Sequence, residues 1–365
     1  MTVKEIVNII EAAAPLSYQE SYDNAGLIIG DADAEVSKAL ICLDLTLEVM
    51  QEAIEKNCKL VIAHHPVIFN PLKKIHPQRH HDKIIVAAIK NDVAVYAAHT
   101  NLDNVYGGIN TYFANSLGLK NIEVLRPVND SLRKLVTFCP LAQSGDVRTA
   151  ICEAGAGHIG DYDFCTYNME GKGSFRASDK ANPFVGNKNE LHFEEEVRIE
   201  TIYPAYLESR ILKALFAAHP YEEVAYDIYP LSNQNMMVGA GAYGMLENPV
   251  PTPKFLQMLK EKMQLSVVKH SSINRPEIQK VALCGGAGSF LLNDAIKKNA
   301  DIFISAEFKH NHFVDLANSI IIADIGHYES EHFAKELIYQ LIIKKFPNFA
   351  VEISQRDVNP VNYFF

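Results

Sequence analysis

Residues 60–66 have the sequence Leu-Val-Ile-Ala-His-His-Pro, and this stretch decides how the rest of the chain is interpreted. The four apolar residues Leu60–Ala63 predict a buried strand. Pro66 has no backbone N–H to give to a sheet and ends the strand, so His64 and His65 are expected at its carboxyl end. Ligands of α/β proteins bind at the carboxyl ends of strands. The sequence therefore places two imidazoles where a functional site is expected.

The segments on either side of this strand predict an α/β layer. Residues 39–42 are a second apolar strand, and residues 47–56 between the two strands have a helical pattern, which completes a βαβ unit. A further helix at 81–90 leads to a strand at 93–97. Because helices alternate with strands, we expect a largely parallel sheet in the first part of the chain.

The chain contains an internal repeat. Residues 38–65 align without a gap with residues 280–307, and Cys42 then matches Cys284. Self-similarity of this kind indicates that one structural unit has been used twice. We therefore expect a second βαβ unit near the C-terminus, built like the first.

Each half also places a histidine and a carboxylate four residues apart behind a strand: His99 with Asp103, and His327 with Glu331. On a helix this spacing puts both side chains on one face. Imidazole and carboxylate together suit Zn, Mn or Fe. Alone, either pair could be a capped helix start, and the pair at 64–65 could lie in a surface loop. Their coincidence at strand ends favours a metal site.

The neighbouring His64 and His65 are expected to diverge from the strand end. Each could then serve a different ion of a two-metal site. A carboxylate such as Glu331 could bridge the two ions and hold them at a fixed separation.

The middle of the chain has another character. It predicts a strand, helix, strand, strand, helix and strand at residues 134–138, 146–154, 162–168, 194–202, 206–218 and 224–228. The order βαββαβ is the ferredoxin-like arrangement. We expect a domain at 131–233 inserted between two duplicated α/β halves, 1–130 and 234–365, which together form one metal-binding domain.

Composition and charge exclude several classes of protein. Lys and Arg number 34 and Asp and Glu number 44, which gives a net charge of −10, so direct DNA binding is not expected. No apolar run approaches the ~20 residues of a membrane span, and residues 1–11 lack the apolar centre of a secretion signal. Six cysteines without a Cys-x-x-Cys pair favour a reducing compartment. We expect a cytoplasmic protein that does not bind membranes.

Three further motifs leave alternatives. The glycine-rich residues 284–289 are either a tight turn capped by Ser289 or a wall that contacts a phosphate. Residues 155–160 match a dinucleotide fingerprint formally, but they follow a helix and precede a strand, the reverse of the required context. Residues 182–186 and 219–223 are typical of turns, with a ligand-binding role for the insert as the alternative. The chain has no Gly-x-Ser-x-Gly elbow and no cysteine paired with a histidine, so no covalent nucleophile is expected.

Four motifs, at residues 22–27, 63–66, 99–103 and 326–331, resemble the NIF-three-like dinuclear-metal family, whose members are also labelled GTP cyclohydrolase 1 type 2 homologs. The resemblance covers essentially the whole chain. The insert, through residues 157–160, 182–184 and 219–223, is similar to that of the long-form members, which carry a PII- or CutA-like domain.

The resemblance implies two divalent metal ions per chain, with zinc as first choice and manganese or iron as alternatives. The implied ligands are His64, His65, Asp103, His327 and Glu331, with Glu331 bridging the ions. His99 is implied to support the ligands without binding an ion itself. The resemblance also implies a toroidal homohexamer whose metal sites face an internal cavity.

Two functions of different classes follow. The leading hypothesis is a metal-dependent hydrolase acting on a small, nucleotide-like substrate, with His99, Glu307 or Glu329 shuttling a proton. The alternative is a regulatory or scaffold hexamer, in which the metals are structural and the insert senses a small ligand or binds a protein partner.

Overall fold

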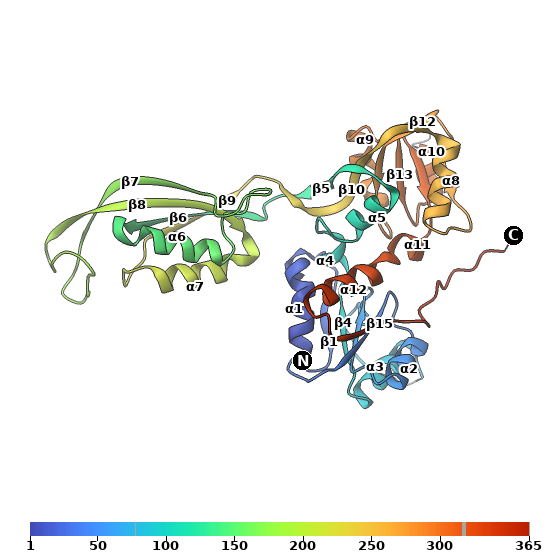
Figure 1. Cartoon of the computed structure of the whole chain (residues 1–365), viewed down its shortest axis with the longest axis horizontal. Coiled ribbons are helices and arrows are strands. Elements are labelled where there is room, and N and C mark those ends of the chain that lie inside the picture. The colour runs from blue at the N-terminus through green and yellow to red at the C-terminus, as the bar shows by residue number, and fades with distance from the viewer. Residues whose placement is uncertain (77, 316–318, 365) are drawn as a thin grey trace. The chain divides into compact units, whose positions relative to one another are not determined.

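The computed structural model describes residues 1–76, 78–315 and 319–364 (Figure 1). The chain divides into two compact units. The main unit comprises Met1–Pro127 and Met236–Phe365, and the inserted unit comprises Val128–Asn235. The expected insert, 131–233, lies within the inserted unit.

The first sheet of the main unit has five strands in the order β1-β4-β3-β2-β15. Their bounds are Gly26–Ile29 for β1, Lys38–Cys42 for β2, Leu60–Ala63 for β3, Ala94–Ala97 for β4 and Ala350–Ile353 for β15. Strands β15, β2, β3 and β4 run parallel, and β1 runs antiparallel to β4. The predicted parallel layer is thereby confirmed, with one strand supplied from the far end of the chain.

The helices of the first half include two that match the predicted ones, α2 (Leu47–Glu55) and α3 (His80–Lys90). The Thr46 hydroxyl accepts from the Val49 N–H and caps α2. The others are α1 (Val3–Ala13), a 3-10 turn (Leu16–Tyr18), the short α4 (Thr100–Asp103) and α5 (Ile109–Leu117).

Four strands of the second sheet repeat four strands of the first in order and direction, whereas β10 is antiparallel to β12 where β15 is parallel to β2. The order of the second sheet is β11-β14-β13-β12-β10-β5, with β12, β13 and β14 parallel. Val281 pairs with Ile302 across β12 and β13, as Ala39 pairs with Leu60 across β2 and β3. These pairs are equivalent in the sequence repeat, so the two βαβ repeats of the main unit share their strand register.

The elements of this half have the following bounds: β5 Lys120–Val128, β10 Asn235–Pro251, β11 Lys269–His270, β12 Glu277–Leu283, β13 Ile302–Ser305 and β14 Ile321–Asp324, with helices α8 Thr252–Lys262, a 3-10 turn Ser289–Leu291, α9 Leu292–Lys297, α10 His310–Asp315, α11 His327–Glu331 and α12 Phe333–Lys345.

The two halves exchange helices. Helix α5 follows the first sheet, but its Phe113 and Leu117 are buried in the core of the second sheet with Ile302. Helix α12 follows the second sheet, but its Ile338 and Ile342 are buried in the core of the first sheet. Because each core is completed by a helix from the other half, the halves form a single folding unit.

The residues after β15 form hydrogen bonds with the backbone at the carboxyl end of β2. The Asp357 carboxylate accepts from the Leu43 N–H at 2.7 Å and pairs with the Lys335 ammonium at 2.9 Å. The buried Glu52 of α2 accepts from the Ser354 hydroxyl and from the backbone N–H groups of residues 355 and 356. This C-terminal clasp fixes the backbone immediately before Asp44.

Replacing Glu52 by glutamine is expected to lower the free energy of unfolding by about 2 kcal/mol at pH 7. Burial opposes ionisation of Glu52, but hydrogen bonds from Lys56, Ser354 and the backbone outweigh it and lower the pKa to about 2. Because the pKa of Glu52 is lower in the folded protein than its ordinary value of 4.5, ionised Glu52 stabilises the fold fully above pH 4.5, and this stabilisation is lost as the pH falls toward 2. Urea unfolding at pH 7 and pH 3.5 checks this: a difference that does not shrink at the lower pH contradicts it.

The inserted unit has the element order β6-α6-β7-β8-α7-β9, the predicted βαββαβ. Its antiparallel sheet has the order β7-β8-β6-β9, and both helices pack on one face, as Figure 1 shows. The bounds are β6 Leu132–Pro140, α6 Ser144–Glu153, β7 Thr166–Arg176, β8 Leu191–Pro204, α7 Glu208–Ala218 and β9 Tyr226–Leu231, with 3-10 turns at Leu141–Gln143 and Ala205–Leu207. The strand predicted at 162–168 was placed too early, because Phe164 has a φ of +53° and the chain becomes extended only after it.

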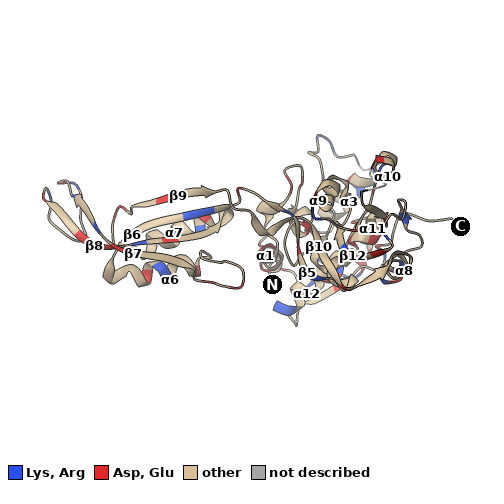
Figure 2. Cartoon of the chain, turned by 90° about the horizontal axis from the view of Figure 1, so that it is seen from above, with Lys and Arg blue, Asp and Glu red and all other residues tan. Residues whose placement is uncertain are grey.

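Acidic and basic residues are interspersed along the elements of each unit (Figure 2). Among the described residues, no helix combines the length and the apolar character needed to cross a membrane.

Candidate metal centre

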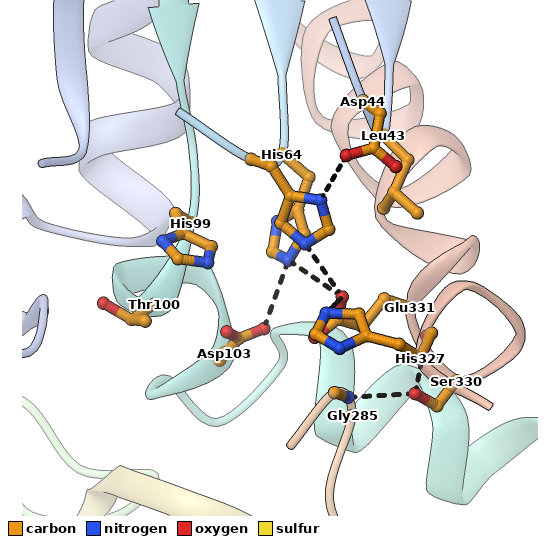
Figure 3. A network of polar contacts seen from close by, with 12 residues as sticks. Leu43, Asp44, His64, His99, Thr100, Asp103, Gly285, His327, Ser330 and Glu331 are labelled. Atoms are coloured by element: carbon orange, nitrogen blue, oxygen red, sulfur yellow. Dashed lines mark hydrogen bonds and ion pairs between the residues drawn. The ribbon is translucent and has the colours of Figure 1, made fainter. Parts of the chain in front are cut away.

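The candidate site lies where the carboxyl ends of β3 and β4 approach the segment with His327 and Glu331 that follows β14 (Figure 3). His64 and His65 follow β3 directly, and their backbone N–H groups continue the ladder to β2 by donating to the Cys42 and Leu43 carbonyls. Asp103 ends α4, the turn of helix after β4. The equivalent turn after β14 is α11, which carries the remaining two predicted residues on one face. All five predicted ligands are therefore brought together.

The Glu331 carboxylate is the centre of the cluster. Its Oε2 atom lies 3.0 Å from His65 Nε2 and 2.9 Å from His327 Nε2. The same oxygen lies 3.9 Å from His64 Nε2. One buried oxygen thus contacts or approaches imidazoles from both halves of the duplicated fold.

Two buried polar atoms beside Glu331 have no hydrogen-bond partner: His64 Nε2 and Asp103 Oδ1, which lie 3.8 Å apart. The His64 side chain is wholly buried. Leaving such a group unsatisfied costs roughly 1–3 kcal/mol, so buried polar atoms are normally paired. A lone pair and a carboxylate oxygen that face each other at this distance are the donor set of a cation site.

In four histidines of the cluster, the Nδ1 atom of the ring is hydrogen-bonded to an oxygen, so that Nε2 is the ring nitrogen left to bind a metal ion. The four pairs are His64 with the Ala98 carbonyl at 2.7 Å, His65 with Asp44 at 2.8 Å, His99 with Asp23 at 2.6 Å and His327 with Glu307 at 2.7 Å. Oxygen acceptors at this position fix the tautomer and the orientation of metal-binding histidines.

His64 and Asp103 are both neutral as long as no cation is bound. Burial lowers the pKa of His64 to about 3, so its ring carries no charge at pH 7. Burial, and after it the charge of Glu331, raises the pKa of Asp103 well above its ordinary range. A neutral imidazole is the form that binds metal, while Asp103 would release its proton on binding.

The other three groups, His65, His327 and Glu331, are held together by hydrogen bonds from the two imidazoles to the carboxylate. Burial opposes protonation of His65, but hydrogen bonds with Asp44 and Glu331 outweigh it and raise its pKa to about 10. The hydrogen bond to Glu331 raises the pKa of His327 to about 9. Burial also opposes ionisation of Glu331, yet hydrogen bonds from His327 and His65 hold its pKa far below the ordinary value. A bound cation would replace these protons as the partner of the carboxylate.

The glycine-rich loop is a tight turn that makes room for Glu331. The N–H groups of Gly285, Gly286 and Gly288 donate to the side chains of Asn110, Ser330 and Ser305. These amides are therefore committed, which disfavours a phosphate-contacting wall. The expected cap at Ser289 is wrong, because the 3-10 turn there has no side-chain cap.

Gly286 has a φ of +59°, and a Cβ there would lie 2.2 Å from Glu331 Oε1. Only a residue without a side chain lets the loop approach the carboxylate this closely.

A pocket of about 300 Å³ opens beside the cluster. His99, Asp103, His327 and Glu331 form part of its wall. The remaining wall includes three aromatic rings and two amides, from Tyr22, Phe69, Phe290, Asn104 and Asn110. The centre is thus reachable by a small molecule.

The structure adds three details to the sequence-based assignment. His99 was expected to support the ligands without binding an ion; its ring also belongs to a further possible metal-binding group with His64 and His65, with ligand atoms within 4.8 Å of one another. Glu329, considered as a proton carrier, instead accepts from Asn359 and Tyr363 of the C-terminal segment.

The third detail is Asp44, which the sequence analysis missed. It comes two residues after β2, at the carboxyl end of the strand beside the one that carries His65. A search for carboxylates behind every parallel strand, rather than for repeated motifs alone, would have identified it.

Comparisons with known proteins are consistent with this arrangement. The sequence model of the Duf34/NIF3 (NGG1p interacting factor 3) family matches residues 1–360. A GTP cyclohydrolase 1 type 2 homolog of Halalkalibacterium halodurans is 39% identical over 324 residues, which are 88% of this chain and 87% of that protein. The homolog of Bacillus subtilis is 35% identical over 369 residues, 99% of this chain and 98% of that protein. The crystal structure of a Bacillus cereus protein related to NIF3 matches with a TM-score of 0.87 and 37% identity, covering 100% of this chain and 99% of that one.

Proposed function

Because this chain belongs to the Duf34/NIF3 (NGG1p interacting factor 3) family, we propose that it binds two divalent metal ions and hydrolyses a nucleotide-like small molecule. The proposed ligands are His64, His65, Asp103, His327 and Glu331. The ions are Zn, Mn or Fe, all of which accept imidazole and carboxylate, with zinc as first choice.

The observation that carries the proposal is the sharing of Glu331 between two possible metal-binding groups. One group is His65, His327 and Glu331, and the other is His64, Asp103 and Glu331. A carboxylate common to two groups is what a bridged pair of ions requires. With five protein ligands for two ions, coordination positions stay open for water and substrate, which favours catalysis over a closed structural site.

When bound, the ions would supply an activated water and polarise the atom under attack. The protein's own residues provide orientation and a proton carrier. Burial raises the pKa of Asp23, but hydrogen bonds with His99 and Thr100 outweigh this and lower it to about 2. The ionised Asp23 therefore holds His99 through Nδ1, and the other ring nitrogen can take up a proton at the pocket wall.

The pocket suits a planar, polar substrate. Tyr22 and Phe69 lie with ring centroids 6.2 Å apart on its wall. Aromatic side chains of this kind can stack on heteroaromatic rings. The amides of Asn104 and Asn110 already donate to Tyr18, Glu20 and Asp103, so the aromatic rings are the groups that support this substrate class. These features, and the names of the relatives, support a nucleotide-like substrate.

We also propose the assembly and setting that the family resemblance implies: a toroidal homohexamer, a PII- or CutA-like inserted unit and a cytoplasmic location. The βαββαβ order and the β7-β8-β6-β9 sheet support the second. All six cysteines are free thiols, which fits a reducing compartment.

The test is metal analysis followed by turnover. Metal-stripped protein is reconstituted separately with Zn, Mn and Fe, dialysed, and analysed for metal per chain, and each form is then incubated with GTP and other nucleotides. We expect about two ions per chain and turnover that chelator removes. Less than about half an equivalent with every metal contradicts the metal centre. Full occupancy without turnover of any nucleotide contradicts the hydrolase and favours a regulatory or scaffold role.

A further inference from the structure

The inserted unit contains a pocket of about 460 Å³, which is within the usual size range of small-molecule sites. It lies on the face of the sheet opposite the helices, because Cys139 and Val197 face the helix-covered core and their neighbours Phe138 and Glu196 point the other way. Residues 177–184 of the β7–β8 connection and residues 221–225 after α7 complete the wall. This is the position at which the sequence left a choice between turn chemistry and a ligand-binding role.

The wall of this pocket is aromatic. The ring of Tyr221 lies 6.1 Å from that of Phe175 and 6.3 Å from that of Phe184, centroid to centroid. Phe138 adds a fourth ring. Phe184 remains 52% exposed although it packs against Tyr221, so part of its ring is available to a ligand. Ring faces carry negative potential and attract cations.

The charges at the pocket all have one sign. Glu196, Glu222 and Glu223 line it, and none of the described lining residues is Lys or Arg. Arg198 does not line the pocket; it pairs with Glu200 at 2.8 Å, and its guanidinium carbon lies 5.8 Å from the centroid of the Phe138 ring. Phe138 therefore already has a cationic neighbour, and the rings of Phe175, Phe184 and Tyr221 are the ones that remain for a ligand. Positive charge is thus attracted both by the rings and by the carboxylates.

Two of these carboxylates are held in place by the pocket's own parts. Glu196 accepts from the Tyr221 hydroxyl at 3.0 Å, and Glu222 accepts from the Asn182 N–H at 2.7 Å, which fastens the segment carrying Phe184. A Cβ at Gly173 would lie 2.0 Å from Glu196 Oε2, so the glycine leaves space for this carboxylate to cross β7. The carboxylates are therefore fixed parts of the wall.

We propose that this pocket binds a small organic cation, of the alkylammonium or alkylguanidinium class, with its charged head against Glu196 and the rings and its alkyl part among the apolar side chains. A phosphate or nucleotide is disfavoured by the three carboxylates. A bare metal ion is disfavoured because the groups of three possible metal ligands found among the described residues all lie in the main unit. A neutral apolar ligand is disfavoured because it would cover the Glu196 carboxylate without supplying a partner for its charge.

The test uses the full-length, metal-loaded protein and calorimetric titration with choline, butylammonium and butylguanidinium. The matched control for choline is 3,3-dimethylbutan-1-ol, in which a carbon atom replaces the charged nitrogen at unchanged shape. We expect at least one cation to bind, and choline, if it is that cation, to bind about tenfold more tightly than its isostere. The proposal is overturned if none binds up to about 10 mM, or if the neutral isostere binds as tightly as choline.

Variants locate the binding. Glu196→Gln keeps an acceptor for Tyr221 but removes the charge, and Phe184→Ala removes one exposed ring; each is expected to weaken cation binding about tenfold. Glu195→Gln is the matched control, because this neighbour is exposed, pairs with Lys172 and does not line the pocket. Unchanged binding in Glu196→Gln, or an equal loss in Glu195→Gln, overturns the assignment. Unfolding temperatures of all three variants exclude a folding defect, and binding must persist in Glu331→Gln, since it does not depend on the metal centre.

Discussion

Replacing Glu331 by glutamine is expected to lower the affinity for both divalent ions by more than about 100-fold and to abolish any hydrolysis. Glutamine preserves the shape of the side chain but removes the charge that Glu331 Oε2 presents to His65 and His327 at 3.0 and 2.9 Å. Because the same oxygen belongs to two possible metal-binding groups, one substitution affects both ions. Metal per chain is measured by elemental analysis after reconstitution and dialysis, with the mass of the assembly determined on the same samples.

The matched control is Glu329→Gln on the same short helix. Its carboxylate bonds Asn359 and Tyr363 and lines no part of the site pocket, so metal content should equal that of the unchanged protein. If Glu331→Gln keeps both ions, Glu331 is not a shared ligand. If it loses the assembly together with the metal, the ions serve a structural purpose.

Gly286→Ala is expected to weaken metal binding nearly as strongly, although residue 286 offers no ligand atom. The new methyl group would lie 2.2 Å from Glu331 Oε1, with backbone on one side and a buried carboxylate on the other. Either the loop or the carboxylate must move, and a displacement of about 1 Å is enough to spoil a preorganised site. Metal per chain and turnover are measured as for Glu331→Gln.

The effect of backbone strain is separated by Gly160→Ala. Gly160 has a φ of +58°, almost that of Gly286, but a Cβ there has nothing within 4 Å. Both substitutions place alanine in the left-handed region at a similar cost of roughly 1 kcal/mol. A loss of metal confined to Gly286→Ala supports the steric argument, and normal metal content in that variant refutes it.

The local architecture of this protein was readable from the sequence where patterns repeat. The apolar strand Leu60–Ala63 and its counterpart in the second half are confirmed, and their strand register follows the repeat. Strand ends then locate the predicted site residues, because the carboxyl ends of parallel strands share one edge of a sheet. This reasoning groups His64, His65 and Asp103 in one half and His327 with Glu331 in the other, whereas the meeting of the two groups depends on how the two sheets pack.

What could not be predicted depends on partners distant in sequence. The amphipathic pattern of α5 shows that one face is buried but not which sheet buries it, so the exchange with α12 was not foreseen. Asp44 gave no motif, and its importance comes from the 2.8 Å contact with His65. Gly286 lies in a motif, but its reason, the approach of Glu331, is visible only in three dimensions.

The exchange of helices has a consequence for synthesis on the ribosome. The core of the first sheet contains Ile338 and Ile342 of α12, and β15 at 350–353 closes the edge of that sheet beside β2. These segments are translated last, so the nascent N-terminal half emerges with an apolar face and an open sheet edge while about 200 further residues are made. At roughly 5–20 residues per second this exposure lasts ten seconds or more. The inserted unit contains its own core and can fold in that interval, whereas the N-terminal half cannot complete its core until α12 and β15 have been made.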